Sequence, residues 1–134
     1  MSDAEAPGSP RAILIGHGDF AAGLISAVKQ ICGAQATSLT GLSMVGMTPA
    51  DLESTLRSTL ESTGASVIFT DLPAGSATIA ARRIVKQDPS VVLVSGVNLA
   101  TLLDFVFNSA MSPAEAARAA AERGKASLIV VTHA

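Results

Sequence analysis

The chain has 134 residues, of which 49% are hydrophobic but only 3% aromatic, and its formal net charge is −2. This length suits one domain with a full hydrophobic core. With no Trp, no Tyr and no excess of basic residues, the chain lacks the stacking side chains and positive surface that nucleic-acid binding requires. A single cysteine, Cys32, excludes an intrachain disulfide and a cysteine-rich metal site.

Residues 1–10 (MSDAEAPGSP) are acidic and contain Pro and Gly. They lack the basic and apolar regions of a signal peptide, and no later apolar run approaches the about 20 residues of a membrane span. We therefore expect a flexible tail over 1–10, one domain over 11–134, and a cytoplasmic protein.

Hydrophobic periodicity then predicts alternating strands and helices along the whole chain. Several helix starts carry a capping residue, notably Thr48 before Pro49 and Asp51, Asn98, and Ser112 before Pro113 and Glu115. Strands are expected over 11–16, 36–42, 65–70, 90–96 and 127–133, and helices over 20–32, 49–62, 76–86, from 99 and from 113 to about 124.

The resulting order, β-α-β-α-β-α-β-α-α-β, predicts a three-layer α/β/α fold with a mainly parallel central sheet. In such sheets the functional site lies beyond the carboxyl ends of the strands. Three sequence features fall there: Gly16-His17-Gly18, Asp71 and Gly96-Val97-Asn98.

These residues suggest a specific chemistry. His17 offers a ring nitrogen that can act as a base, ligand or nucleophile. Asp71 could accept the Nδ1 proton of the ring and leave Nε2 with a free lone pair. Amides at Gly18, Gly75 and Ser76, beside a helix start, would bind an anion. Together they favour phosphoryl transfer onto histidine.

A simpler interpretation stays open, in which His17 satisfies loop groups and Asp71 and Asn98 are caps or turn residues. Zinc binding is less favoured, because the only other histidine, His133, lies beside the carboxyl terminus. The sequence has no G-x-S-x-G nucleophile elbow and no Walker loop, and Ala21 interrupts a G-x-G-x-x-G pattern.

Three segments carry a family resemblance: AILIGHGDFAAGL, TDLPAGSATIAARRIV and SGVNLATLLDFVF. In order and spacing they resemble the mannose-family enzyme IIA of the bacterial sugar phosphotransferase system, over residues 11–134. The resemblance implies that His17 is phosphorylated on Nε2, that Asp71 holds the other ring nitrogen, and that Ser76 and Asn98 support the site.

The same resemblance implies the partners. Phosphate would come from the histidine-containing phosphocarrier protein and pass to enzyme IIB during sugar import through a membrane permease, with no metal and no cofactor. It also implies a homodimer whose last strand is antiparallel, at the sheet edge, and can be exchanged between subunits; residues 128–133 (LIVVTH) are the expected segment.

The chain departs from the family motifs at Ala74, Ala77, Ala100 and Thr101, where Gly, Pro, Pro and Met are usual. These changes concern the loop contour and the partner-facing surface and leave the His–Asp pair intact. Three alternatives remain: a regulatory phosphorylated module without sugar import, the phosphocarrier subunit of dihydroxyacetone kinase, and a small-ligand or nucleotide-binding domain without covalent chemistry.

Overall fold

The computed structural model describes residues 9–133, so most of the expected tail over 1–10 lies outside the described residues. The elements are β1 (Ala12–Gly16), α1 (Phe20–Cys32), the 3₁₀ helix η1 (Gly33–Ser38), β2 (Leu39–Ser43), α2 (Pro49–Thr63), β3 (Val67–Thr70), α3 (Ser76–Gln87), β4 (Val92–Ser95), α4 (Leu99–Phe107) and α5 (Pro113–Ala126).

The strands of the described chain form one four-stranded sheet in the order β2-β1-β3-β4, and every neighbouring pair is parallel. In register, Ala12 lies opposite Leu39 on one side and Val67 on the other, and Val67 lies opposite Val92. The predicted α/β class with a parallel sheet is confirmed.

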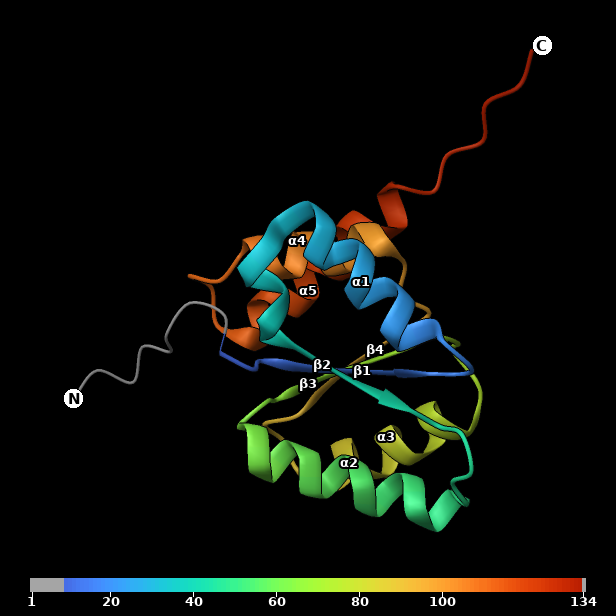
Figure 1. Cartoon of the computed structure of the whole chain (residues 1–134), viewed down its shortest axis with the longest axis vertical. Coiled ribbons are helices and arrows are strands. Elements are labelled where there is room, and N and C mark those ends of the chain that lie inside the picture. The colour runs from blue at the N-terminus through green and yellow to red at the C-terminus, as the bar shows by residue number, and fades with distance from the viewer. Residues whose placement is uncertain (1–8, 134) are drawn as a thin grey trace.

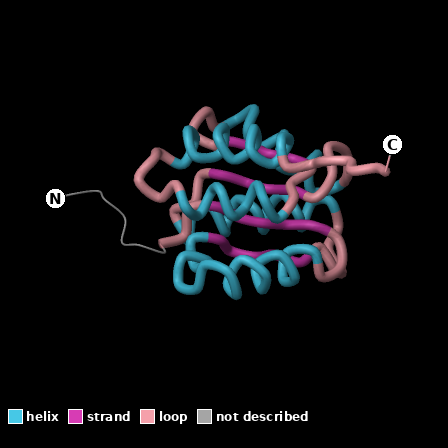
Figure 2. The backbone as a smooth tube through the Cα atoms, turned by 90° about the horizontal axis from the view of Figure 1, so that it is seen from above, coloured by secondary structure: helices cyan, strands magenta, loops and turns pink. Residues whose placement is uncertain are grey.

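Helices cover both faces of the sheet. Helices α1, α4 and α5 lie on one side and α2 and α3 on the other (Figure 1), and the view from above shows the strands running side by side beneath the helices (Figure 2). Successive strand residues point to opposite faces, so Leu14 joins the core under α1, α4 and α5, whereas Ile15 joins the core over α2 and α3. In the first core the rings of Phe69 and Phe105 meet edge to face, with centroids 5.0 Å apart.

The predicted helix starts are confirmed where local capping signals were present. The Thr48 side chain accepts a hydrogen bond from the Asp51 amide, and the Asp51 carboxylate accepts one from the Thr48 amide. Ser112 accepts from the Glu115 amide in the same way. Such caps satisfy backbone donors that the first helical turn leaves open.

Two strand predictions differ from the structure. Residues 33–38 form a 3₁₀ helix, so the strand expected over 36–42 begins only at Leu39. The expected antiparallel edge strand over 127–133 is absent from the single chain: α5 continues to Ala126, and no strand is assigned among the described residues beyond it. The carboxyl-terminal segment instead extends away from the domain (Figure 1).

Leu128, Ile129, Val130 and Val131 are 73–88% exposed in this extended segment. High strand propensity did not produce a strand here, because a strand needs a neighbour to hydrogen-bond with. Within residues 9–133, no helix combines the length and apolar character that crossing a bilayer would require.

Candidate functional site

The strand order brings two of the predicted residues together. In the sheet, β1 lies between β2 and β3, and β4 lies beyond β3 at the edge. The chain thus first moves from β1 to its neighbour on one side, β2, and then crosses to the other side for β3 and β4. The sheet therefore reverses its winding between β1 and β3, and such a switch point leaves a crevice at the carboxyl ends of the two strands. His17 directly follows β1 and Asp71 directly follows β3.

His17 and Asp71 contact each other through one carboxylate oxygen. The Oδ2 atom of Asp71 lies 2.7 Å from Nδ1 of the His17 ring and accepts a hydrogen bond of 2.9 Å from the His17 backbone amide. The histidine side chain is 60% exposed, whereas that of Asp71 is only 12% exposed. The carboxylate thus holds both the backbone and the ring of His17, and the ring remains accessible to a partner.

Opposing effects act on the Asp71 carboxyl. Its burial is the largest single influence and raises the pKa, but the hydrogen bonds from the His17 amide and ring, with the charge of that ring, together outweigh it and hold the pKa below its usual value. An ionised carboxylate can only accept hydrogen bonds. The ring nitrogen Nδ1 is therefore the donor, and in the neutral ring Nε2 keeps its lone pair.

Gly16, the last residue of β1, makes this approach possible. A Cβ atom at this position would lie 2.6 Å from Cδ2 of Phe20 and 3.0 Å from Cγ and Oδ2 of Asp71. Both distances are shorter than an ordinary van der Waals contact. Glycine here lets the carboxylate and the Phe20 ring pack directly against the strand end.

The amino-terminal end of α3 lies beside the ring. Gly75 is the N-cap residue of α3 with φ +147°, a conformation that favours glycine. A Cβ on Gly75 would lie 3.9 Å from Cε1 of His17, the carbon between the two ring nitrogens. Ser76 is exposed at the first position of the helix, and no acidic residue occupies the first turn. First-turn amides of a helix can bind an anion.

Gly18 follows His17 directly and has φ +49°, so glycine permits the turn that separates β1 from α1. The residues around it offer apolar surface: Leu72 is 48% exposed, and Phe20 is partly buried against the core under α1. Leu72 is thus available to a partner, and Phe20 serves packing at least in part.

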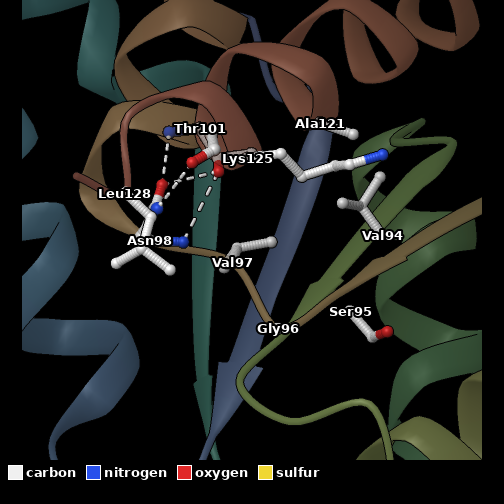
Figure 3. A pocket seen from close by; sticks show the side chains of 10 residues that line it. Val94, Ser95, Gly96, Val97, Asn98, Thr101, Ala121, Lys125 and Leu128 are labelled. Atoms are coloured by element: carbon white, nitrogen blue, oxygen red, sulfur yellow. Dashed lines mark hydrogen bonds between the residues drawn. The ribbon is translucent and has the colours of Figure 1, made fainter. Parts of the chain in front are cut away.

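The predicted supporting residue Asn98 lies in a different arrangement. It is the N-cap of α4: its Oδ1 accepts from the Thr101 amide at 3.0 Å, and its side-chain amide donates to the Gly124 carbonyl of α5 at 3.0 Å. Among the described residues, Asn98 forms no hydrogen bond with His17 or Asp71. Figure 3 shows Asn98 and Thr101 together on the wall of a pocket of about 230 Å³, which Leu128 also lines.

The tight packing of α4 against α5 explains this use of Asn98. A Cβ on Gly124 would lie 2.0 Å from Oγ1 of Thr101, so the two helices meet where a side chain is missing. Among residues 9–133 no group of three or more His, Cys, Asp or Glu side chains is arranged to hold a metal ion. Cys32 ends α1, and burial raises the pKa of its thiol.

Two contacts at the site were not predicted from the sequence, that of Gly16 with Asp71 and that of Thr70 with Thr78. Gly16 stood in the quoted motif, but its contact with Asp71 depends on the adjacency of β1 and β3. The hydroxyls of Thr70 and Thr78 are fully buried and lie 2.8 Å apart below the Asp71 loop. Their only signal was that Thr70 stands at the end of an apolar strand and Thr78 on the apolar side of a helix.

The sequence matches one protein-family model. The family model EIIA-man, described as PTS system fructose IIA component, matches residues 11–122. A search of curated proteins found no match.

Solved structures share the fold. The phosphotransferase system component EIIA from Streptococcus agalactiae superposes with a TM-score of 0.80 at 20% identity, covering 90% of this chain and 95% of that one. The mannose/sorbose specific IIA subunit from Enterococcus faecalis gives 0.79 at 19% identity, with 92% and 96% covered. A sigma-54 interaction domain protein from Enterococcus faecalis gives 0.71 at 11% identity, with 90% and 94% covered.

Proposed function

The chain belongs to the EIIA-man family of phosphotransferase-system IIA components, and we propose that His17 is its phosphorylated residue. In this proposal His17 accepts a phosphoryl group from the histidine-containing phosphocarrier protein and passes it to a histidine of enzyme IIB. The observation that carries the proposal is the 2.7 Å contact between Nδ1 of His17 and Oδ2 of Asp71 below an exposed ring.

The proposed step is an in-line displacement. The lone pair on Nε2 of His17 attacks the phosphorus of the donor phosphohistidine, a new Nε2–P bond forms, and the P–N bond of the donor breaks with its electron pair returning to the donor ring. His17 keeps its Nδ1 proton throughout. The ring therefore gains positive character as the bond forms, and the Asp71 carboxylate stabilises that charge.

Backbone amides would stabilise the transferring group. The three equatorial oxygens carry most of the charge in phosphoryl transfer, and preorganised donors lower the barrier. Gly18 directly follows His17, and the start of α3 at Gly75 and Ser76 lies beside the His17 ring; we assign these backbone amides to this task. Because the bond that breaks and the bond that forms both join phosphorus to a histidine nitrogen, the transfer is near balanced and needs no metal in this scheme.

Labelling of the two histidines tests the assignment. The protein is incubated with phosphoenolpyruvate, enzyme I and the phosphocarrier, and the phosphorylated peptide is mapped by mass spectrometry. We expect acid-labile phosphate on His17, no labelling of His17→Ala, and normal labelling of His133→Ala, since His133 is exposed in the carboxyl-terminal segment. Label retained by a folded His17→Ala protein, or label on His133, would contradict the proposal.

Transfer onward is a separate experiment. Purified phosphorylated protein is mixed with enzyme IIB, and loss of phosphate from His17 is followed against its gain on the acceptor. This function places the protein in the cytoplasm, beside a membrane permease complex, where phosphocarrier and enzyme IIB meet.

A regulatory role is the second candidate. The fold likeness to a sigma-54 interaction domain protein favours it, because the same phosphorylatable domain would then report carrier phosphorylation without sugar import. The two roles differ in the acceptor: a regulatory module would be labelled by the phosphocarrier but would transfer nothing to enzyme IIB. A dihydroxyacetone kinase subunit would instead transfer phosphate to that kinase.

We also propose a homodimer formed through the carboxyl-terminal segment. Residues 128–131 expose four consecutive large apolar side chains, and β4 is an edge strand of the described sheet. Exposed apolar segments and open sheet edges both favour pairing with another chain. An antiparallel strand from a second copy along β4 would cover both.

Deletion of residues 127–134 tests the dimer. The full chain should sediment as a dimer and the truncated chain as a monomer, and Val130→Asp should act like the truncation, because it places a charge in the proposed interface. A full chain that sediments as a monomer at every concentration would refute this arrangement.

A further inference from the structure

Two buried hydroxyl groups lie under the loop that carries Asp71. Thr70 ends β3 with 0% of its surface exposed, and Thr78 in the first turn of α3 is 1% exposed. Their Oγ1 atoms are 2.8 Å apart. The Thr78 hydroxyl also donates to the carbonyl of Leu72 at 2.5 Å.

The two hydroxyl groups and the Leu72 carbonyl form a short series of hydrogen bonds with a defined direction. Each threonine hydroxyl has one proton to donate. The Leu72 carbonyl oxygen lies 2.5 Å from Oγ1 of Thr78 but 3.5 Å from Oγ1 of Thr70. The Thr78 hydroxyl is therefore the donor to this carbonyl, and the Thr70 hydroxyl donates to Oγ1 of Thr78. The result is a directed chain, Thr70 to Thr78 to the Leu72 carbonyl, in an environment where a missing partner is costly.

Hydrogen bonds hold the backbone carbonyls on either side of Asp71. The carbonyl before it, that of Thr70, accepts a hydrogen bond from the Val97 amide at 3.1 Å. The carbonyl one residue after it, that of Leu72, accepts from Thr78. The backbone is thus held on both sides of the residue whose carboxylate reaches His17, and neither hydrogen bond involves His17 itself.

We propose that Thr78, supported by Thr70, is a positioning residue for Asp71, and that its hydroxyl couples the carboxylate to the first turn of α3. The inference rests on the proposed function of the His17–Asp71 pair. Thr78 belongs to the same helical turn as the assigned phosphoryl-binding amides. Its hydroxyl therefore fixes the position of the Asp71 carboxylate relative to that turn. Removal of the Thr78 hydroxyl should make the orientation of the His17 ring less fixed, although Thr78 forms no hydrogen bond with His17.

The test compares Thr78→Val with Thr78→Ser and with a control. Valine keeps the shape but removes the hydroxyl, and serine keeps the hydroxyl. Thr59→Val is the matched control, because the Thr59 hydroxyl bonds only to the Thr55 carbonyl within α2, 2.7 Å away. Circular dichroism establishes folding, and ¹⁵N NMR of the His17 ring at alkaline pH gives the tautomer.

We expect the wild type, Thr78→Ser and Thr59→Val to hold the proton on Nδ1. Thr78→Val should shift toward the mixture of tautomers of an unstructured peptide, and its rate of phosphoryl transfer from the carrier should fall about 10-fold, as expected when a reacting group is slightly misplaced. If Thr78→Val fails to fold, the pair Thr78→Ala and Thr78→Ser, which differ only in the hydroxyl, replaces it.

A double-mutant cycle separates positioning from packing. In an Asp71→Ala background, Thr78→Val should slow transfer no further, because the group that it positions is gone. A wild-type tautomer in Thr78→Val, or an equal slowing in both backgrounds, would overturn the inference. The tautomer is measured without any phosphoryl transfer, so failure of the proposed function and failure of this inference can be told apart.

Discussion

Substitution of Gly16 by alanine perturbs the His–Asp pair through the strand that supports it. The added Cβ would lie 2.6 Å from Cδ2 of Phe20 and 3.0 Å from the Asp71 carboxylate, whereas ordinary contacts begin at 3.4 Å. The Phe20 ring must therefore retreat by about 0.8 Å and the carboxylate by about 0.4 Å, by subtraction of these distances.

The shift of the carboxylate sets the expected effect. Moving Oδ2 by that amount away from His17 would lengthen the 2.7 Å contact to about 3.1 Å, near the limit for a good hydrogen bond. We expect the rate of phosphoryl transfer to fall about 10-fold. Overpacking should also lower the free energy of unfolding by about 1–3 kcal/mol.

Single-turnover transfer from phosphorylated carrier and urea unfolding measure the two effects. Gly23→Ala is the matched control, because a Cβ at this position in α1 meets nothing within 4 Å. Alanine is the better helix former there by roughly 0.5–1 kcal/mol, so this variant should be at least as stable as the wild type and equally active. A Gly16→Ala protein with wild-type rate and stability would refute the close approach of Asp71 to the strand end.

Two further predictions concern charge and packing. Because the folded pKa of the Asp71 carboxyl lies below its usual value of 3.8, its ionisation stabilises the fold above about pH 4, and this stabilisation is lost as the pH falls through the folded pKa. The difference in unfolding free energy between wild type and Asp71→Asn should therefore stay level near pH 5 and shrink toward pH 2; a difference that grows on acidification would contradict the sign. Gly124→Ala should lower the free energy of unfolding by about 1–3 kcal/mol or more, since its Cβ would lie 2.0 Å from the Thr101 hydroxyl, and the His17 tautomer should be unchanged in whatever fraction remains folded. Wild-type thermal stability in that variant would refute the tight contact between α4 and α5.

The capping interpretation of Asn98 shows how far local signals reach. Its position before an apolar helix predicted a cap, and the structure confirms that cap with Thr101. The supporting role at the site came from resemblance, and it stays a prediction, because the Asn98 side chain bonds to α4 and α5. An amide side chain has few donors and acceptors, and neighbours that are close along the chain take them first.

The carboxyl-terminal segment shows the opposite limit. Its apolar β-branched residues predict a strand, because strand propensity depends only on the residue types in the segment. A strand, however, exists only where another strand supplies hydrogen bonds, and no strand is assigned over residues 128–133 in the single chain. The edge strand at this end of the chain stays a prediction, which the proposed dimer would fulfil.

What the sequence by itself determined is therefore the order of helices and strands, most of their starts, and the kinds of residue at the strand ends. These depend on spacings of two to four residues, which hydrophobic periodicity and capping groups specify directly. Only the tertiary structure decided that β1 and β3 are neighbours, which brings His17 and Asp71 within 2.7 Å across 54 positions of the chain. Strand order is set by packing of the whole sheet against its helices, and no local pattern encodes it.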